Sequence, residues 1–172
     1  RGVAHQLDSM GIKMGLWFEP EMVSAKSELY KQHPDWCLHV PGRARQTGRN
    51  QLVLDMGRQD VRDYLFDVIS NILGSAKISY VKWDMNRYLT EVFSTRVSSR
   101  DQGRVAHRFV TGTYSLLRPR LPLLHYNGQL LLLVCAHTQL DRQTTFFVRL
   151  RSDSKNSRLV AGKMTRRCRH YY

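Results

Sequence analysis

The sequence has no long hydrophobic run and few cysteines. Its longest uninterrupted apolar stretch, Leu130–Ala136, has seven residues, whereas a membrane-spanning helix needs about 20. The three cysteines, Cys37, Cys135 and Cys168, are odd in number and far apart, which suits neither a disulfide framework nor a metal cluster. These absences exclude a membrane span and favour a protein of the reducing cytoplasm.

Acidic residues are also scarce, above all near the carboxyl end. The chain has 27 Lys and Arg against 14 Asp and Glu, a net charge of +13. Residues 1–117 hold 16 basic and 12 acidic side chains, whereas residues 118–172 hold 11 and 2. A basic protein would ordinarily suggest a nucleic-acid partner. Because the excess of positive charge lies mainly in the tail, we do not expect a nucleic-acid partner here.

Strand and helix signals alternate from Gly11 to Leu117, which is typical of a parallel sheet covered by helices. Strands are predicted at Ile12–Phe18, Leu52–Leu54 and Ile78–Asp84, and helices at Ser27–His33, Asp60–Leu73 and Gln102–Leu117. Apolar stripes on the second and third helices consist of Val61, Leu65, Val68, Ile69 and Ile72, and of Val105, Phe109 and Leu116. The segment from Leu52 to Asp84 predicts a right-handed parallel crossover. The predicted fold class is therefore α/β.

Beyond Leu117 this alternation stops. Arg118-Pro119-Arg120 breaks the third helix, and residues 118–172 form a divergent, basic tail that we expect to be poorly ordered. Leu130–Val134 and Phe146–Leu150 are its two candidate strands. The chain is therefore predicted to divide into a domain over residues 1–117 and a tail over residues 118–172.

The segment from Tyr80 to Arg87, Tyr-Val-Lys-Trp-Asp-Met-Asn-Arg, carries most of the chemical information. Because side chains alternate along a strand, Lys82 and Asp84 project from one face while Trp83 takes the other. Residues at positions i and i+2 on one face of a strand lie roughly 6.6 Å from each other. The Lys82 ammonium and the Asp84 carboxylate are therefore near enough to bind one substrate together. The same spacing suits a structural ion pair, and spacing alone leaves both interpretations open.

Three motifs follow one another along the chain. They are Gly15-Leu16-Trp17-Phe18-Glu19-Pro20-Glu21, Gly48-Arg49-Asn50-Gln51-Leu52-Val53-Leu54-Asp55 and Lys82-Trp83-Asp84-Met85-Asn86-Arg87. In this order they resemble the α-galactosidases of glycoside hydrolase family 36, and the resemblance continues to about Leu117. It implies that residues 1–117 are an internal part of a TIM (β/α)8 barrel. It also implies retaining hydrolysis of terminal α-D-galactosides such as melibiose and raffinose, without a metal or an organic cofactor, in a homo-oligomeric enzyme.

Carried across residue by residue, the resemblance assigns Asp84 as the nucleophile that forms a galactosyl-enzyme intermediate, which retention requires. It assigns Lys82 and Asn86 to hydrogen bonds with sugar hydroxyls, Arg49 to substrate binding and Trp17 to the sugar pocket. Two of these residues also have plainer interpretations from the sequence itself. Trp17 suits an ordinary core, and Arg49 suits a solvated basic loop.

A retaining glycosidase needs a second carboxyl group about 5 to 5.5 Å from the nucleophile. The tail offers only Asp141 and Asp153, and Asp153 is the candidate for the general acid, although its neighbours differ from the family pattern. Glu19 and Glu21 are left unassigned. A TIM barrel takes eight strands and about 250 residues, whereas residues 1–117 supply about three strands. Since the chain begins at Arg1 without a Met or an apolar leader, we predict an incomplete fragment that lacks its N-terminal part.

Two other functions stay open at this point. The first is galactosyl transfer by a raffinose-synthase-like barrel, which the sequence does not separate from hydrolysis. The second is an inactive fragment whose basic tail binds nucleic acid through arginines interleaved with aromatic residues. For that role the tail offers only dispersed arginines together with Phe146, Phe147, Tyr171 and Tyr172.

Overall fold

The structure, a computed structural model, describes residues 2–117, 129–136, 144–151 and 160–164. The chain folds into two compact units, each built from segments that are separate in the sequence. The first unit comprises Arg1–Phe18, Lys77–Asn86 and His125–Tyr172, and the second comprises Glu19–Ala76 and Arg87–Leu124. The division into a domain and a tail at residue 117 stays a prediction.

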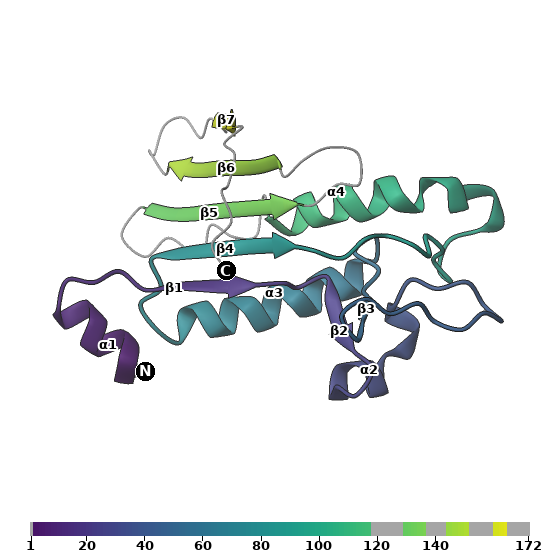
Figure 1. Ribbon diagram of the computed structural model, residues 1–172, viewed down its shortest axis with the longest axis horizontal. Helices are drawn as coiled ribbons and strands as arrows, with labels where there is room; N and C mark the ends of the chain where they lie inside the picture. Colours follow the sequence, from purple (N-terminus) through teal and green to yellow (C-terminus); the bar gives the residue numbers. More distant parts are fainter. Residues whose placement is uncertain (1, 118–128, 137–143, 152–159, 165–172) are drawn as a thin grey trace. The chain divides into compact units, whose positions relative to one another are not determined.

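A sheet forms the centre of the first unit. Within the described residues it has five strands in the order β1-β4-β5-β6-β7 (Figure 1). Their bounds are Gly15–Phe18 for β1, Tyr80–Met85 for β4, Gln129–Ala136 for β5, Thr144–Arg151 for β6 and Val160–Met164 for β7. The pairs β1–β4 and β4–β5 are parallel, whereas β5–β6 and β6–β7 are antiparallel. A helix that we did not predict, α1 (Gly2–Ser9), precedes β1.

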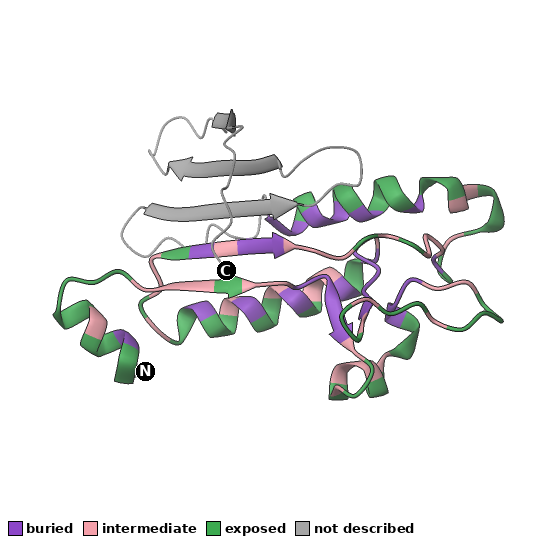
Figure 2. Cartoon of the chain, viewed as in Figure 1, coloured by how far each residue is buried: buried purple, intermediate pink, exposed green. Residues whose placement is uncertain are grey.

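The second unit combines helices with a small antiparallel sheet. In that sheet β2 (Met22–Ser24) pairs with β3 (Gln51–Val53). The helices are α2 (Glu28–Gln32), α3 (Gln59–Gly74) and α4 (Val105–Leu117), with 3₁₀ turns η1 (Pro34–Trp36) and η2 (Ser99–Arg104). α3 and α4 pack against each other, and each has a buried stripe in Figure 2. Within the described ranges, no helix combines the length and the apolar character that a membrane crossing requires.

The three predicted helices are confirmed with small changes at their ends. Ser27 caps α2, because its hydroxyl accepts a hydrogen bond from the Tyr30 N–H at 3.2 Å. η1 then begins at Pro34, which has no N–H with which to continue α2. η2 and α4 together span the third predicted helix, and its inward residues Val105, Phe109 and Leu116 are buried.

α3 buries a narrower stripe than the sequence predicts. Its buried residues are Val61, Leu65, Ile69 and Leu73, which recur every four positions and so share one side of the helix. Val68 and Ile72 are 37% and 40% exposed, and their predicted place in the stripe is wrong. Each of them precedes a buried residue by one position, which rotates it by about 100° away from the buried face.

The predicted crossover from Leu52 to Asp84 is wrong, although its two strands and its helix are present. β3 pairs with β2, while β4 pairs with β1 and β5, so the two strands belong to different sheets. Main-chain hydrogen bonds hold the end of β3, from the Leu54 N–H to Glu21 O and from the Leu38 N–H to Val53 O, both at 2.9 Å. An apolar run predicts a strand but does not specify which strand lies beside it.

Three segments of the tail form strands. The candidates Leu130–Val134 and Phe146–Leu150 lie within β5 and β6, and β7 was not predicted. β5 extends the parallel part of the sheet beside β4. The described part of the chain is therefore a partial α/β fold with three parallel strands and an antiparallel extension.

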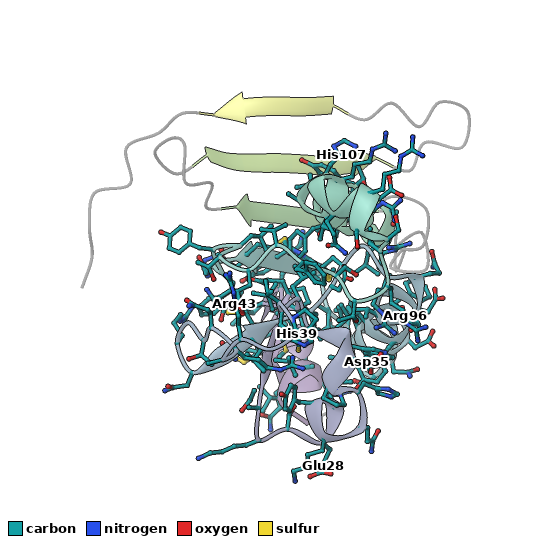
Figure 3. The ribbon with its side chains drawn as sticks, turned by 90° about the vertical axis from the view of Figure 1, so that its right-hand side faces the viewer. Glu28, Asp35, His39, Arg43, Arg96 and His107 are labelled. Atoms are coloured by element: carbon teal, nitrogen blue, oxygen red, sulfur yellow. The ribbon has the colours of Figure 1, made fainter. Side chains whose placement is uncertain are left out.

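Arg58, the residue before α3, is buried and joins two acidic side chains. Its guanidinium donates to Asp35 Oδ2 at 2.8 Å and to both carboxylate oxygens of Asp60 at 3.0 and 2.7 Å. These hydrogen bonds lower the pKa of the Asp60 carboxyl. Burial alone raises the pKa of Asp35, but the Arg58 contacts outweigh it, and Arg96, labelled close to Asp35 in Figure 3, lowers that pKa further. The cluster fixes the start of α3.

Candidate active site

β1 and β4 bring predicted site residues of the first unit to neighbouring positions. The two strands pair in parallel, with Trp17 opposite Lys82. Along β4, Val81 and Trp83 are 2% and 1% exposed, whereas Tyr80 is 44% exposed. The alternation predicted for this strand, with Lys82 on the face of Tyr80 and away from Trp83, is therefore confirmed.

Lys82 contacts Asp84, as predicted, and also Trp17. Its Nζ atom lies 3.4 Å from Asp84 Oδ2 and 4.9 Å from the centroid of the Trp17 ring. A cation over an indole face is attracted by the ring quadrupole, so the ammonium is held between an aromatic ring and a carboxylate. Trp17 is 58% exposed, and its interpretation as an ordinary core residue is wrong.

Asp84 is the buried charge of this group. Its side chain is 8% exposed, against 41% for Lys82. Oδ2 faces the ammonium, whereas Oδ1 is buried and, within the described part of the chain, accepts no hydrogen bond. Buried carboxylate oxygens are normally paired, because an unpaired one has lost its water without compensation. An oxygen without a donor keeps its lone pairs available, as a nucleophile requires.

Asn86 is the first residue beyond β4 and is partly buried. The structure thus brings Trp17, Lys82 and Asp84 together and places Asn86 at the end of the same strand. Arg49 belongs to the second unit and is described with that unit.

Arg49 and Asn50 form the centre of a tight turn. The Gly48 N–H donates to Gln51 O and the Gln51 N–H donates to Gly48 O, both at 3.0 Å. The φ angles of Arg49 and Asn50 are 54° and 60°, the left-handed pair that defines a type I′ turn. Asparagine adopts this region readily, but arginine does so at a cost of about 1 kcal/mol. Residues held in such strained conformations cluster at functional sites.

Glu19 holds the head of Arg49. Arg49 Nη1 donates to Glu19 Oε1 at 2.8 Å, and the two side chains are 58% and 22% exposed. Arg49 is thus an exposed charge, as its plainer interpretation expects, but one that is strained and paired with an acid. Sequence reasoning left Glu19 unassigned, although its place in the same motif as Trp17 was a signal that it has a role.

Glu21 is the second acid that sequence reasoning left unassigned. It is 1% exposed, and its Oε1 accepts a hydrogen bond from the Arg87 N–H at 3.2 Å. A charged side chain buried this completely stays so only with partners. In the sequence, Glu21 lies two residues after Glu19, across Pro20. Nothing in that position indicates that the main chain beyond Asn86 is a partner of the Glu21 carboxylate.

Other reactive groups contribute little to this site. Among the residues that the structure describes, no group of three or more His, Cys, Asp and Glu is arranged to hold a metal ion. Cys37 is buried, and burial raises the pKa of its thiol to about 11, so little reactive thiolate forms at neutral pH. The predicted general acid, Asp153, lies outside the described residues.

A buried carboxylate and an ammonium thus lie together near the carboxyl end of a parallel strand, beside an exposed indole. The chain belongs to the Melibiase family, whose model matches residues 1–136. The match continues past Leu117, where the resemblance was expected to end, and reaches the last residue of β5.

Its relatives are α-galactosidases. α-Galactosidase AgaA of Geobacillus stearothermophilus is 56% identical over 116 residues, which are 67% of this chain and 16% of AgaA. A crystal structure of substituted AgaA in complex with raffinose is similar with a TM-score of 0.68 at 54% identity, over 70% of this chain and 17% of that one. The α-galactosidase of Lactobacillus brevis has a TM-score of 0.73 at 47% identity, over 78% and 18%. The chain thus spans less than a fifth of the length of these relatives.

Proposed function

We propose that this chain supplies the nucleophile of an α-galactosidase, which hydrolyses terminal α-D-galactosides with retention of configuration. Asp84 is that nucleophile. The observation that carries the proposal is its environment: it is buried at the end of β4, with Oδ2 facing Lys82 and Oδ1 without a hydrogen-bond donor among the described residues. The Melibiase match and the α-galactosidase relatives support the sugar.

The reaction has two displacements. A carboxylate oxygen of Asp84 attacks the anomeric carbon, and the bond to the aglycone oxygen breaks as that oxygen takes a proton from a general acid. Water then attacks the same carbon and gives up a proton, and the bond to Asp84 breaks with its electron pair returning to the carboxylate. Two inversions at one carbon leave the α configuration of the released galactose.

Three residues assist Asp84 in this proposal. Lys82 keeps the carboxylate in place and donates to a galactose hydroxyl with its other N–H bonds. Trp17 offers an exposed indole face against which the apolar side of the sugar ring packs. Asn86 donates and accepts hydrogen bonds at the end of β4. Raffinose, bound by the substituted AgaA, represents the substrate class.

The first displacement is testable without the general acid. In the described residues of the first unit the only carboxylate besides Asp84 is Asp8, which forms an ion pair with Lys77 at 2.5 Å. A fluoride leaving group departs with its bonding electrons and needs no proton. α-Galactosyl fluoride therefore reports on the nucleophile alone.

We expect the chain to release fluoride from α-galactosyl fluoride and to form α-galactose first, as followed by fluorine and proton nuclear magnetic resonance. Formation of the β anomer first, or no release above the buffer rate, would contradict the proposal. Adding sucrose separates hydrolysis from transfer, because a galactosyl transferase would convert the sucrose to raffinose.

Arg49 is the fourth residue that we propose to bind the sugar, and Arg49→Gly should separate folding from sugar binding. Glycine adopts a positive φ without strain, so we expect the thermal unfolding midpoint to stay unchanged or rise. The concentration of α-galactosyl fluoride that gives half the maximal rate should rise about tenfold, the effect of losing one hydrogen bond from a charged group. Asn50→Gly is the matched control, since it changes the same turn and keeps the guanidinium. Unchanged half-saturation in Arg49→Gly would remove Arg49 from the sugar site.

A further inference from the structure

The main chain directly after Asn86 is tied to a buried acid. The Arg87 N–H donates to Glu21 Oε1 at 3.2 Å, and Glu21 is 1% exposed. The main-chain oxygen of Glu21 in turn accepts from the Leu54 N–H at 2.9 Å. These hydrogen bonds therefore fix the backbone position from which the Arg87 side chain extends within the second unit.

The Arg87 guanidinium reaches from this origin to the segment that precedes the Arg49 turn. Nη1 donates to Tyr88 O at 3.0 Å, and Nη2 donates to Gln46 O at 2.9 Å. Gln46 is held a second time, because its N–H donates to Glu91 Oε2 at 3.0 Å. Two contacts on one residue restrict where the following turn begins.

Gly48, the first residue of that turn, lies against the same guanidinium. A Cβ atom built on Gly48 would be 2.9 Å from Arg87 Cζ and 2.9 Å from Nη1, closer than real side chains approach. Gly48 has no positive φ, so its backbone conformation does not require glycine. A side chain at this position would instead displace the Arg87 guanidinium.

The turn that Arg87 contacts needs external support. Arg49 and Asn50 both have positive φ angles, and the strain at Arg49 favours opening of the turn. Two arrangements oppose that opening. Glu19 bonds the Arg49 head at 2.8 Å, and Arg87 holds the chain that leads into Gly48.

We infer that Arg87 is a positioning residue, which anchors the entrance of the turn at Gln46 and Gly48 and thereby sets the place of Arg49. Its importance for catalysis rests on the proposed function, in which Arg49 binds the sugar. Lysine would not replace it, because a single ammonium lacks the flat face that lies on Gly48 and the fork that reaches two carbonyl oxygens.

Site-resolved trypsin digestion tests the anchor without any sugar. Trypsin cleaves after Arg49 only when the turn opens, so Arg87→Ala should speed that cleavage about tenfold, the effect of losing one charged hydrogen bond. Gly48→Ala should act in the same direction, because its methyl group displaces the guanidinium while keeping the charge. Arg87→Lys should resemble Arg87→Ala more than the unsubstituted chain.

Arg62→Ala is the matched control. Arg62 also donates to a main-chain carbonyl, that of Met56 at 2.8 Å, but it does so from α3 and supports the start of that helix instead of the turn. We expect its replacement to leave cleavage after Arg49 unchanged. The inference is overturned if cleavage after Arg49 is unchanged in both Arg87→Ala and Gly48→Ala. It is also overturned if cleavage after Arg104 increases equally, because that would report general unfolding.

Kinetics with α-galactosyl fluoride test the link to the sugar. Arg87→Ala should raise the half-saturating concentration about tenfold, as for Arg49→Gly, and change the maximal rate much less. A fall in the maximal rate alone would overturn a role through Arg49. If the unsubstituted chain releases no fluoride, the proposed function fails, while the cleavage pattern still decides whether Arg87 holds the turn.

Discussion

Asp84→Asn is expected to abolish covalent capture of 5-fluoro-α-galactosyl fluoride, with a loss on the order of 10⁴-fold or more in the rate. The amide has almost the same size as the carboxylate, so the packing around residue 84 is kept. Its oxygen is a poor nucleophile, and the bond to the anomeric carbon does not form. The ring fluorine slows the second displacement in the unsubstituted chain, so the adduct accumulates and mass spectrometry measures it directly.

Asp8→Asn is the control for this loss. Asp8 is the other described carboxylate of the first unit, and it is engaged with Lys77, so its replacement should leave capture intact. Asp84→Ala with added azide provides a second test on α-galactosyl fluoride. Azide occupies the space of the carboxylate, attacks the anomeric carbon as fluoride leaves, and should give β-galactosyl azide by a single inversion. Capture that persists in Asp84→Asn, or an α-azide product, would show that another group attacks the sugar.

Gly112→Ala should destabilise the second unit by about 2 to 3 kcal/mol through overpacking. A Cβ atom at this position of α4 would overlap the main-chain oxygen of Met56, and Met56 is 0% exposed. A carbonyl group cannot swing aside as a flexible side chain can, so α4 must move away from the start of α3. The sign is opposite to the usual effect, because alanine normally stabilises a helix interior by about 1 kcal/mol relative to glycine.

Gly74→Ala is the matched control for Gly112→Ala. Gly74 is the last residue of α3, and a Cβ atom there meets nothing within 4 Å. We expect this variant to be as stable as the unsubstituted chain or slightly more stable in urea unfolding. If Gly112→Ala unfolds at the same urea concentration as Gly74→Ala, the close contact between α4 and Met56 does not exist in solution.

The helices were predictable because their signals are local. Ser27 before α2, the apolar stripe along α3 and the apolar positions of α4 each act within one or two helical turns. The sheet partners were not predictable in the same way. β3 is a short apolar run that pairs with β2 through contacts that are distant in sequence, such as Met22 with Val53, and nothing within either strand specifies that choice.

In the candidate site too, the features set by local sequence signals were predictable and those set by distant contacts were not. Alternation along β4 put Lys82 and Asp84 on one face, and the family motif gave them roles. The turn at Arg49 escaped prediction, because a positive φ at arginine leaves no mark in the sequence. The contacts of Glu21 and Arg87 escaped it as well, since they join residues that lie 66 positions apart.

Peptide mapping of the 5-fluorogalactosyl adduct tests most directly whether the Asp84 carboxylate is the nucleophile. Trypsin cleaves after Lys82 and Arg87, which leaves Asp84 as the only carboxylate in the peptide Trp83-Asp84-Met85-Asn86-Arg87. We predict that tandem mass spectrometry of the labelled chain will place the added sugar on Asp84. An adduct on another peptide, or no adduct while AgaA is labelled under the same conditions, would contradict Asp84 as the nucleophile.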